Sequence, residues 1–137
     1  MAGVGWETGP VNRRMRKKLQ AKLADALYCD DPERLAALLR ADADPLVHRD
    51  GETALYRASV QGAAGNVRVL LEAGAPPNEE CDEGLPLCGA ACWGHDDAVR
   101  ELLAAGADPL LKEHGTLSAL EWAERNGYDS TVALLRG

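Results

Sequence analysis

Residues 70–77 read Leu-Leu-Glu-Ala-Gly-Ala-Pro-Pro, and residues 102–109 read Leu-Leu-Ala-Ala-Gly-Ala-Asp-Pro. A weaker copy, Leu-Leu-Arg-Ala-Asp-Ala-Asp-Pro, occupies residues 38–45, and a fourth Leu-Leu pair lies at residues 134–135. Each pair follows the previous one by 32 residues. A fixed period of this length is typical of proteins built from stacked structural repeats. The sequence therefore predicts a repeat architecture along most of the chain.

A second block upstream of each Leu-Leu pair predicts a short helix that ends at a glycine. The block reads Thr-Ala-Leu-Tyr-Arg-Ala from residue 53, Leu-Pro-Leu-Cys-Gly-Ala from residue 85 and Ser-Ala-Leu-Glu-Trp-Ala from residue 118. Leu and Ala at a spacing of three residues give a narrow apolar stripe. The glycines that follow suit the left-handed position that ends a helix, and they are Gly62, Gly94 and Gly127. Since the Leu-Leu pair lies on a second helix, we expect each repeat to be a pair of helices.

The order helix, glycine, helix, Leu-Leu-x-x-Gly-Ala-Asp-Pro resembles the ankyrin repeat, most closely in residues 85–109. The resemblance covers roughly residues 19–137 and implies an all-α solenoid of helix-turn-helix repeats with short hairpin fingers. No copy has the intact Thr-Pro-Leu-His tetrapeptide of the family, and Asp30 and Asp42 replace helix-ending glycines in the first copy. We interpret the first and last copies as capping units with one solvated face. The implied repeats span residues 19–46, 47–78, 79–110 and 111–137.

The N-terminal segment differs in charge from the rest of the chain. Residues 1–22 hold six basic residues and one acidic residue, a net charge of +5, whereas residues 23–137 hold nine basic and 21 acidic residues, a net charge of −12. We expect a loose, glycine-rich arm over residues 1–12 and a helix over residues 13–27, so that the arm and the start of a capping helix span residues 1–18. The cations either lie against the acidic body, dock an acidic partner or contact nucleic acid weakly.

Composition favours a binding protein over an enzyme. Aromatic residues make up 4% of the 137 residues and Phe is absent, so the core is expected to consist of Leu, Ala and Val. Such a core suits thin helical layers better than a large catalytic pocket. The three histidines do not accompany an activated Ser or Cys, and the sequence contains no phosphate-binding loop and no His-Glu-x-x-His motif. We therefore expect no catalysis and no cofactor.

The resemblance assigns a partner-binding face by position. In ankyrin repeats the concave face is formed by the finger tips and by the two residues before the glycine that ends each inner helix. Tyr28 and Trp93 fall at such positions, and both are of residue types enriched at binding hot spots. The indole of Trp93 has an alternative role as packing against the next repeat, and packing is the expected role of Trp122. The predicted partner-binding residues are Tyr28, Arg49, Asp50, Glu52, Val60, Gln61, Asp82, Cys92, Trp93, His114, Leu117, Arg125 and Asn126.

The predicted function is binding of another protein, as an interaction module or adaptor that is monomeric alone. Acidic finger residues favour a basic partner surface, and the acidic body disfavours binding to nucleic acid. A dedicated inhibitor or immunity-type protein for one enzyme would use the same surface, and the sequence does not distinguish the two.

A different alternative is a zinc site or redox-sensing thiol pair formed by Cys81, Cys88, Cys92 and His95. Their spacing lacks the Cys-x₂-Cys pair of structural zinc sites, and each has an ordinary position in the repeat. We expect free thiols in a cytoplasmic protein. The longest run without a charged residue spans residues 84–95, which is too short to cross a membrane.

Overall fold

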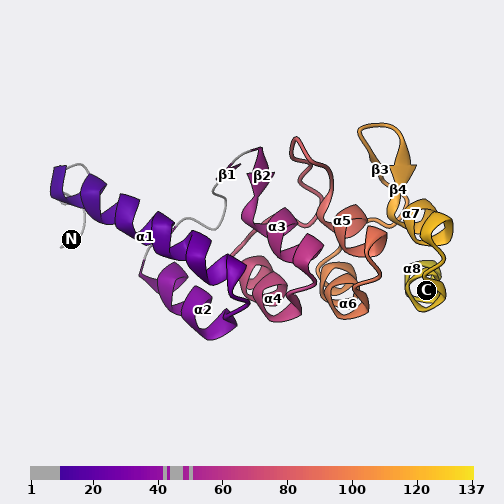
Figure 1. Cartoon of the computed structure of the whole chain (residues 1–137), viewed down its shortest axis with the longest axis horizontal. Coiled ribbons are helices and arrows are strands. Elements are labelled where there is room, and N and C mark those ends of the chain that lie inside the picture. Colours follow the sequence, from indigo (N-terminus) through magenta and orange to yellow (C-terminus); the bar gives the residue numbers. More distant parts are fainter. Residues whose placement is uncertain (1–9, 42, 44–47, 50) are drawn as a thin grey trace.

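The computed structural model describes residues 10–41, 43, 48–49 and 51–137, in which eight helices form four pairs. Figure 1 shows the pairs side by side along the long axis, with odd-numbered helices in one row and even-numbered helices in another. The predicted all-α repeat solenoid is confirmed. The pairs are α1 (Pro10–Tyr28) with α2 (Pro32–Arg40), α3 (Ala54–Gln61) with α4 (Ala64–Glu72), α5 (Pro86–Cys92) with α6 (Asp96–Ala104), and α7 (Ala119–Asn126) with α8 (Asp129–Arg136).

Three short hairpins, which we call the first, second and third fingers, project beside the odd-numbered helices (Figure 1). In the first finger β1 (His48–Arg49) pairs antiparallel with β2 (Glu52–Thr53). The second finger, residues 79–84, is closed by one antiparallel bridge between Cys81 and Gly84. In the third finger β3 (Lys112–Glu113) pairs with β4 (Leu117–Ser118).

Each inner helix, α1, α3, α5 or α7, is followed by a residue in the left-handed conformation. Gly62, Gly94 and Gly127 have φ values of 73°, 70° and 77°, and Asp30 takes the same role in the first repeat with φ of 48°. Two of these glycines have a second constraint, because an added Cβ would lie 2.6 Å from the ring of His95 at Gly62 and 2.6 Å from that of Tyr128 at Gly94. Stacking of the repeats therefore depends on the residues that end the helices.

The last repeat departs from the 32-residue period of the others. The first leucine of the pair is buried in the first three copies, whereas in the last copy Leu135 is buried and Leu134 is partly exposed. The reason lies in the third finger, where three residues separate Glu113 from Leu117, while two separate Arg49 from Glu52 in the first finger. The added residue shifts every later position by one, so that Leu135 takes the place of Leu102.

Helix α1 begins earlier than the sequence indicated. The predicted helix started at Arg13 after a loose arm, but α1 starts at Pro10 and continues to Tyr28. Proline is favoured in the first turn of a helix because an amide hydrogen there has no acceptor within the helix. Residues 1–9 of the predicted arm lie outside the described residues. The beginning of α1 extends past the end of α2 (Figure 1), and Leu19 and Gln20 are the first of its described side chains to be partly buried.

Asp96 joins the third and fourth repeats and should make stability depend on pH. Its carboxylate accepts hydrogen bonds from the Ser130 hydroxyl at 2.6 Å and the Thr131 hydroxyl at 2.5 Å, and these bonds hold the pKa of Asp96 below its ordinary value of 3.8. A carboxylate whose pKa is lowered by folding stabilises the fold above its unfolded pKa and loses that contribution as the pH falls through the folded value.

We therefore expect Asp96→Asn to lower the melting temperature at neutral pH, and the difference from the wild type to shrink on acidification to about pH 2. Circular dichroism melts of both proteins across this range measure the difference. An equal deficit at every pH would contradict a role for the ionised carboxylate.

Candidate functional site

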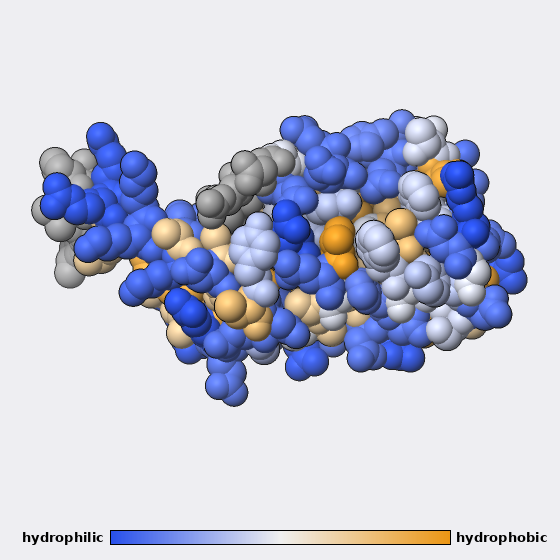
Figure 2. Space-filling model, viewed as in Figure 1, coloured by the Kyte–Doolittle hydropathy of each residue, from blue (hydrophilic) through white to orange (hydrophobic). Residues whose placement is uncertain are grey.

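The inner helices and the fingers together form one side of the stack, which we call the inner face. Two rows of corresponding positions run along it, at the ends of the four inner helices or directly after them. One row contains Tyr28, Val60, Cys92 and Arg125, and the other contains Cys29, Gln61, Trp93 and Asn126. Figure 2 shows hydrophilic residues over the fingers, with paler and apolar residues over the inner helices beneath them.

Two large aromatic side chains stand out from this face. Tyr28 and Trp93 are each 60% exposed. The guanidinium carbon of Arg57 lies 5.2 Å from the ring centroid of Tyr28, and Arg57 also forms an ion pair with Glu52 of the first finger. Trp93 directly follows α5, and its side chain is largely exposed rather than buried in the core. Both rings are therefore accessible to a partner.

The fourth repeat combines accessible and structural residues. Trp122 is partly buried against the core, which confirms its predicted packing role, and its Nε1 donates to Glu113 at 3.1 Å. Asn126 Nδ2 donates to the Cys92 carbonyl at 2.9 Å, so this predicted contact residue also ties α7 to α5. Arg125 is exposed, with its guanidinium carbon 5.8 Å from the Trp122 ring centroid.

Glu113 of the fourth repeat supplies the hydrogen-bond acceptor for the first turn of α5 in the third repeat. Thr53 and Ser118 cap α3 and α7 with their own side chains, but Leu85 at the corresponding position has no side chain able to do so. The Glu113 carboxylate accepts from the Leu85 amide at 3.0 Å, as Glu121 accepts from the Ser118 amide in α7. Burial raises the pKa of Glu113, against the lowering effect of the bonds from Leu85 and Trp122.

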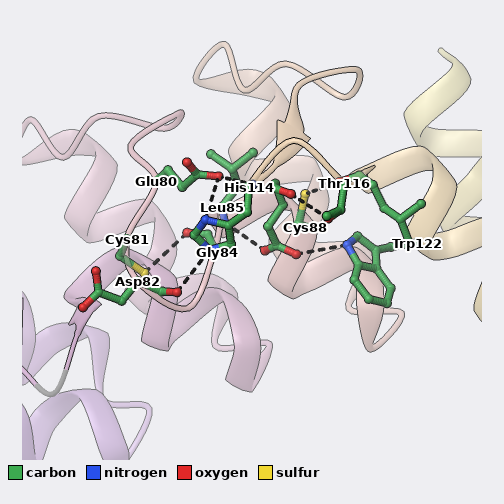
Figure 3. A network of polar contacts seen from close by, with 11 residues as sticks. Glu80, Cys81, Asp82, Gly84, Leu85, Cys88, His114, Thr116 and Trp122 are labelled. Atoms are coloured by element: carbon green, nitrogen blue, oxygen red, sulfur yellow. Dashed lines mark hydrogen bonds and ion pairs between the residues drawn. The ribbon is translucent and has the colours of Figure 1, made fainter.

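Hydrogen bonds link the fingers to each other, and Figure 3 shows those between the second and third fingers. The Asp82 amide donates to the Gly51 carbonyl at 3.0 Å, which joins the first finger to the second. The His114 amide donates to Glu80 at 2.5 Å, and the His114 ring lies 3.1 Å from the Asp82 carbonyl, which joins the second finger to the third. His114 therefore has a structural role as well as an exposed ring edge.

Each of the four residues of the metal alternative has its own partner, and for Cys92 the Sγ atom accepts from Asn126 Nδ2 at 3.6 Å. Cys81 donates to the Gly84 carbonyl at 3.4 Å, Cys88 lies 3.9 Å from the Leu117 carbonyl, and the His95 ring lies 2.9 Å from the Val60 carbonyl. Within the described residues, which include all four, no group of three or more His, Cys, Asp or Glu is arranged to hold a metal ion.

The thiols are also poorly suited to redox sensing. All four cysteines are free, and Cys81 and Cys88 are buried. Burial raises the pKa of Cys88 to about 12 and also raises the pKa of Cys92. Because the thiolate is the reactive and metal-binding form, neither sulfur is activated at neutral pH.

The remaining predicted contact residues differ in accessibility. Gln61 and Asp82 are exposed, whereas Glu52, Val60, Cys92 and Leu117 are partly buried. The side chain of Arg49 and all of Asp50 lie outside the described part of the chain. Arg57 is an inner-face residue that the sequence analysis missed, although it precedes Val60 and Gln61 by three and four residues and so shares their helix face.

Residues 23–113, more than half of the chain, match the sequence pattern of a known family described as ankyrin repeats, in three copies. No curated protein gives a match. None of the helices in the described ranges is both long enough and apolar enough to cross a membrane.

Proposed function

The chain belongs to the ankyrin repeat family, and we propose that it binds another protein through its inner face and catalyses no reaction. Ankyrin repeat domains are typically protein-protein interaction modules. The observation that supports this face over others is the exposure of Tyr28 and Trp93, each at 60%. The other described aromatic side chains, those of Tyr56, Trp122 and Tyr128, are partly buried, whereas these two are exposed on the inner face.

The two rings are spaced for one partner to contact both. They lie two repeats apart, which corresponds to about 20 Å for neighbouring helices packed at roughly 10 Å. Val60 and Gln61 of α3 lie in the rows between them. At binding hot spots, aromatic anchor residues are usually surrounded by contacts that contribute little to the binding free energy.

The charge of the fingers favours a partner with a basic surface. Glu80, Asp82 and Glu83 of the second finger are exposed, whereas Glu52 of the first is engaged by Arg57. Exposed carboxylates at an interface rim mainly accelerate association with a basic partner. We further propose that the chain is monomeric alone and acts in the cytoplasm, where its four free thiols stay reduced.

Site-specific crosslinking tests the assignment of the face. A photoreactive amino acid at Gln61, exposed in the centre of the inner face, should form adducts with a partner in extract of the native host. The same group at Arg100, exposed on the outer helix α6, is the matched control. Adducts from position 100 but not from position 61 would place the partner on the other side of the stack. The identity of the adduct distinguishes an adaptor from an inhibitor of one enzyme.

A further inference from the structure

The beginning of α1 is a cationic helix that projects from the stack. Five cationic residues between positions 13 and 22 have described side chains, and all five are exposed. No acidic residue occurs from position 10 to position 24. Among the side chains that the structure describes, none of these cations forms an ion pair. They are Arg13, Arg14, Lys17, Lys18 and Lys22.

Repulsion between its own charges destabilises the beginning of α1 as a helix. Like charges four residues apart face each other along it, in the pairs Arg13 with Lys17, Arg14 with Lys18, and Lys18 with Lys22. Its first turn contains no acidic residue to complement the positive end of the helix dipole. A helical segment this short that lacks tertiary contacts is marginal in water. An anionic partner would remove these costs.

One apolar side chain accompanies the cations. Met15 is 54% exposed, while Leu23, eight residues later on the same helix face, is fully buried in the core. Leu19 lies between them and is partly buried. Met15 therefore extends the apolar stripe of α1 beyond the edge of the stack. In this position it is accessible to an apolar residue of a partner that binds the cations.

We propose that the beginning of α1, from Pro10 to Lys22, is a second docking surface, distinct from the inner face, which binds a short acidic segment of a protein. Nine residues of projecting helix span about 14 Å, nearly twice the Debye length of about 8 Å at physiological salt. A short acidic segment can contact this helix without approaching the body, residues 23–137, whose net charge is −12. A lipid bilayer or a long duplex is an extended anionic surface, and it would be repelled by that body.

The test measures binding of a short fluorescein-labelled peptide of Asp, Glu and Leu to the full chain by fluorescence anisotropy. We expect saturable binding that weakens as salt is added, and no binding of a peptide with Asn and Gln in place of the acids. Lys17→Glu with Lys18→Glu should weaken binding about tenfold or more. Arg34→Glu with Arg40→Glu makes the same change in net charge at exposed positions on α2 and should have little effect.

Two further measurements distinguish binding at this helix from binding at the inner face. The peptide should slow hydrogen exchange of the amides in α1, and Trp93→Ala should leave peptide binding unchanged, since Trp93 belongs to the inner face. An equal loss of peptide affinity in the α1 and α2 double variants, or no binding of the acidic peptide by the wild type, would overturn the proposal. Tighter binding of phosphatidylserine vesicles or duplex DNA through Lys17 and Lys18 would overturn the choice of an acidic protein segment.

Discussion

Replacing Leu70 by alanine should lower the free energy of unfolding by about 2–5 kcal/mol. Leu70 is fully buried on α4, an outer helix of an internal repeat, and so are Val67 on the same helix and Leu102 on α6. Helix α4 packs against α2 on one side and α6 on the other. Because both neighbours hold the layer open, the cavity left by truncation can collapse only in part.

Urea unfolding followed by circular dichroism measures this loss. The matched control is Leu71→Ala, since Leu71 is adjacent in sequence but only partly buried, and a smaller loss is expected there. If Leu70→Ala cost less than about 1 kcal/mol, or no more than Leu71→Ala, the repeat would not depend on this layer for its stability.

The repeat and its helix pairs could be predicted from the sequence because the same side chains recur at corresponding places. Leu70 and Leu102 are buried for the same reason, and Gly62 and Gly94 end their helices with nearly the same backbone angles. The last repeat departs from this pattern for an identifiable reason, because one additional residue in the third finger moves the buried position from Leu134 to Leu135.

Interactions between repeats were less accessible to sequence reasoning. Glu113 caps α5 from a position 28 residues after Leu85, and no local pattern links the two. Arg57 joins Tyr28 of one repeat to Glu52 of the first finger through contacts that depend on how the helices stack. The burial of Cys81, whose side chain donates to the Gly84 carbonyl within the second finger, was likewise not indicated by the sequence pattern.

Replacing Trp93 by alanine should weaken binding of the natural partner by about 2 kcal/mol or more, roughly 30-fold in Kd. The indole is 60% exposed, so the substitution should leave no cavity in the core and should change the melting temperature little. Its neighbour Cys92 is held to the next repeat through the backbone carbonyl, which the substitution preserves. The expected loss therefore belongs to the interface rather than to folding.

Leu110→Ala is the matched control for this substitution. Leu110 is also a large exposed apolar residue, at 67%, but it follows α6 and lies outside the two rows of the inner face. Its truncation should leave the affinity for the partner unchanged.

The most direct test uses the partner that is identified by crosslinking at Gln61. This partner is titrated against the wild type, Trp93→Ala and Leu110→Ala, and a thermal melt is recorded for each protein. Binding through the inner face predicts a Kd raised roughly 30-fold for Trp93→Ala alone, with three similar melting temperatures. Unchanged affinity in a folded Trp93→Ala protein, or an equal loss for Leu110→Ala, would contradict it.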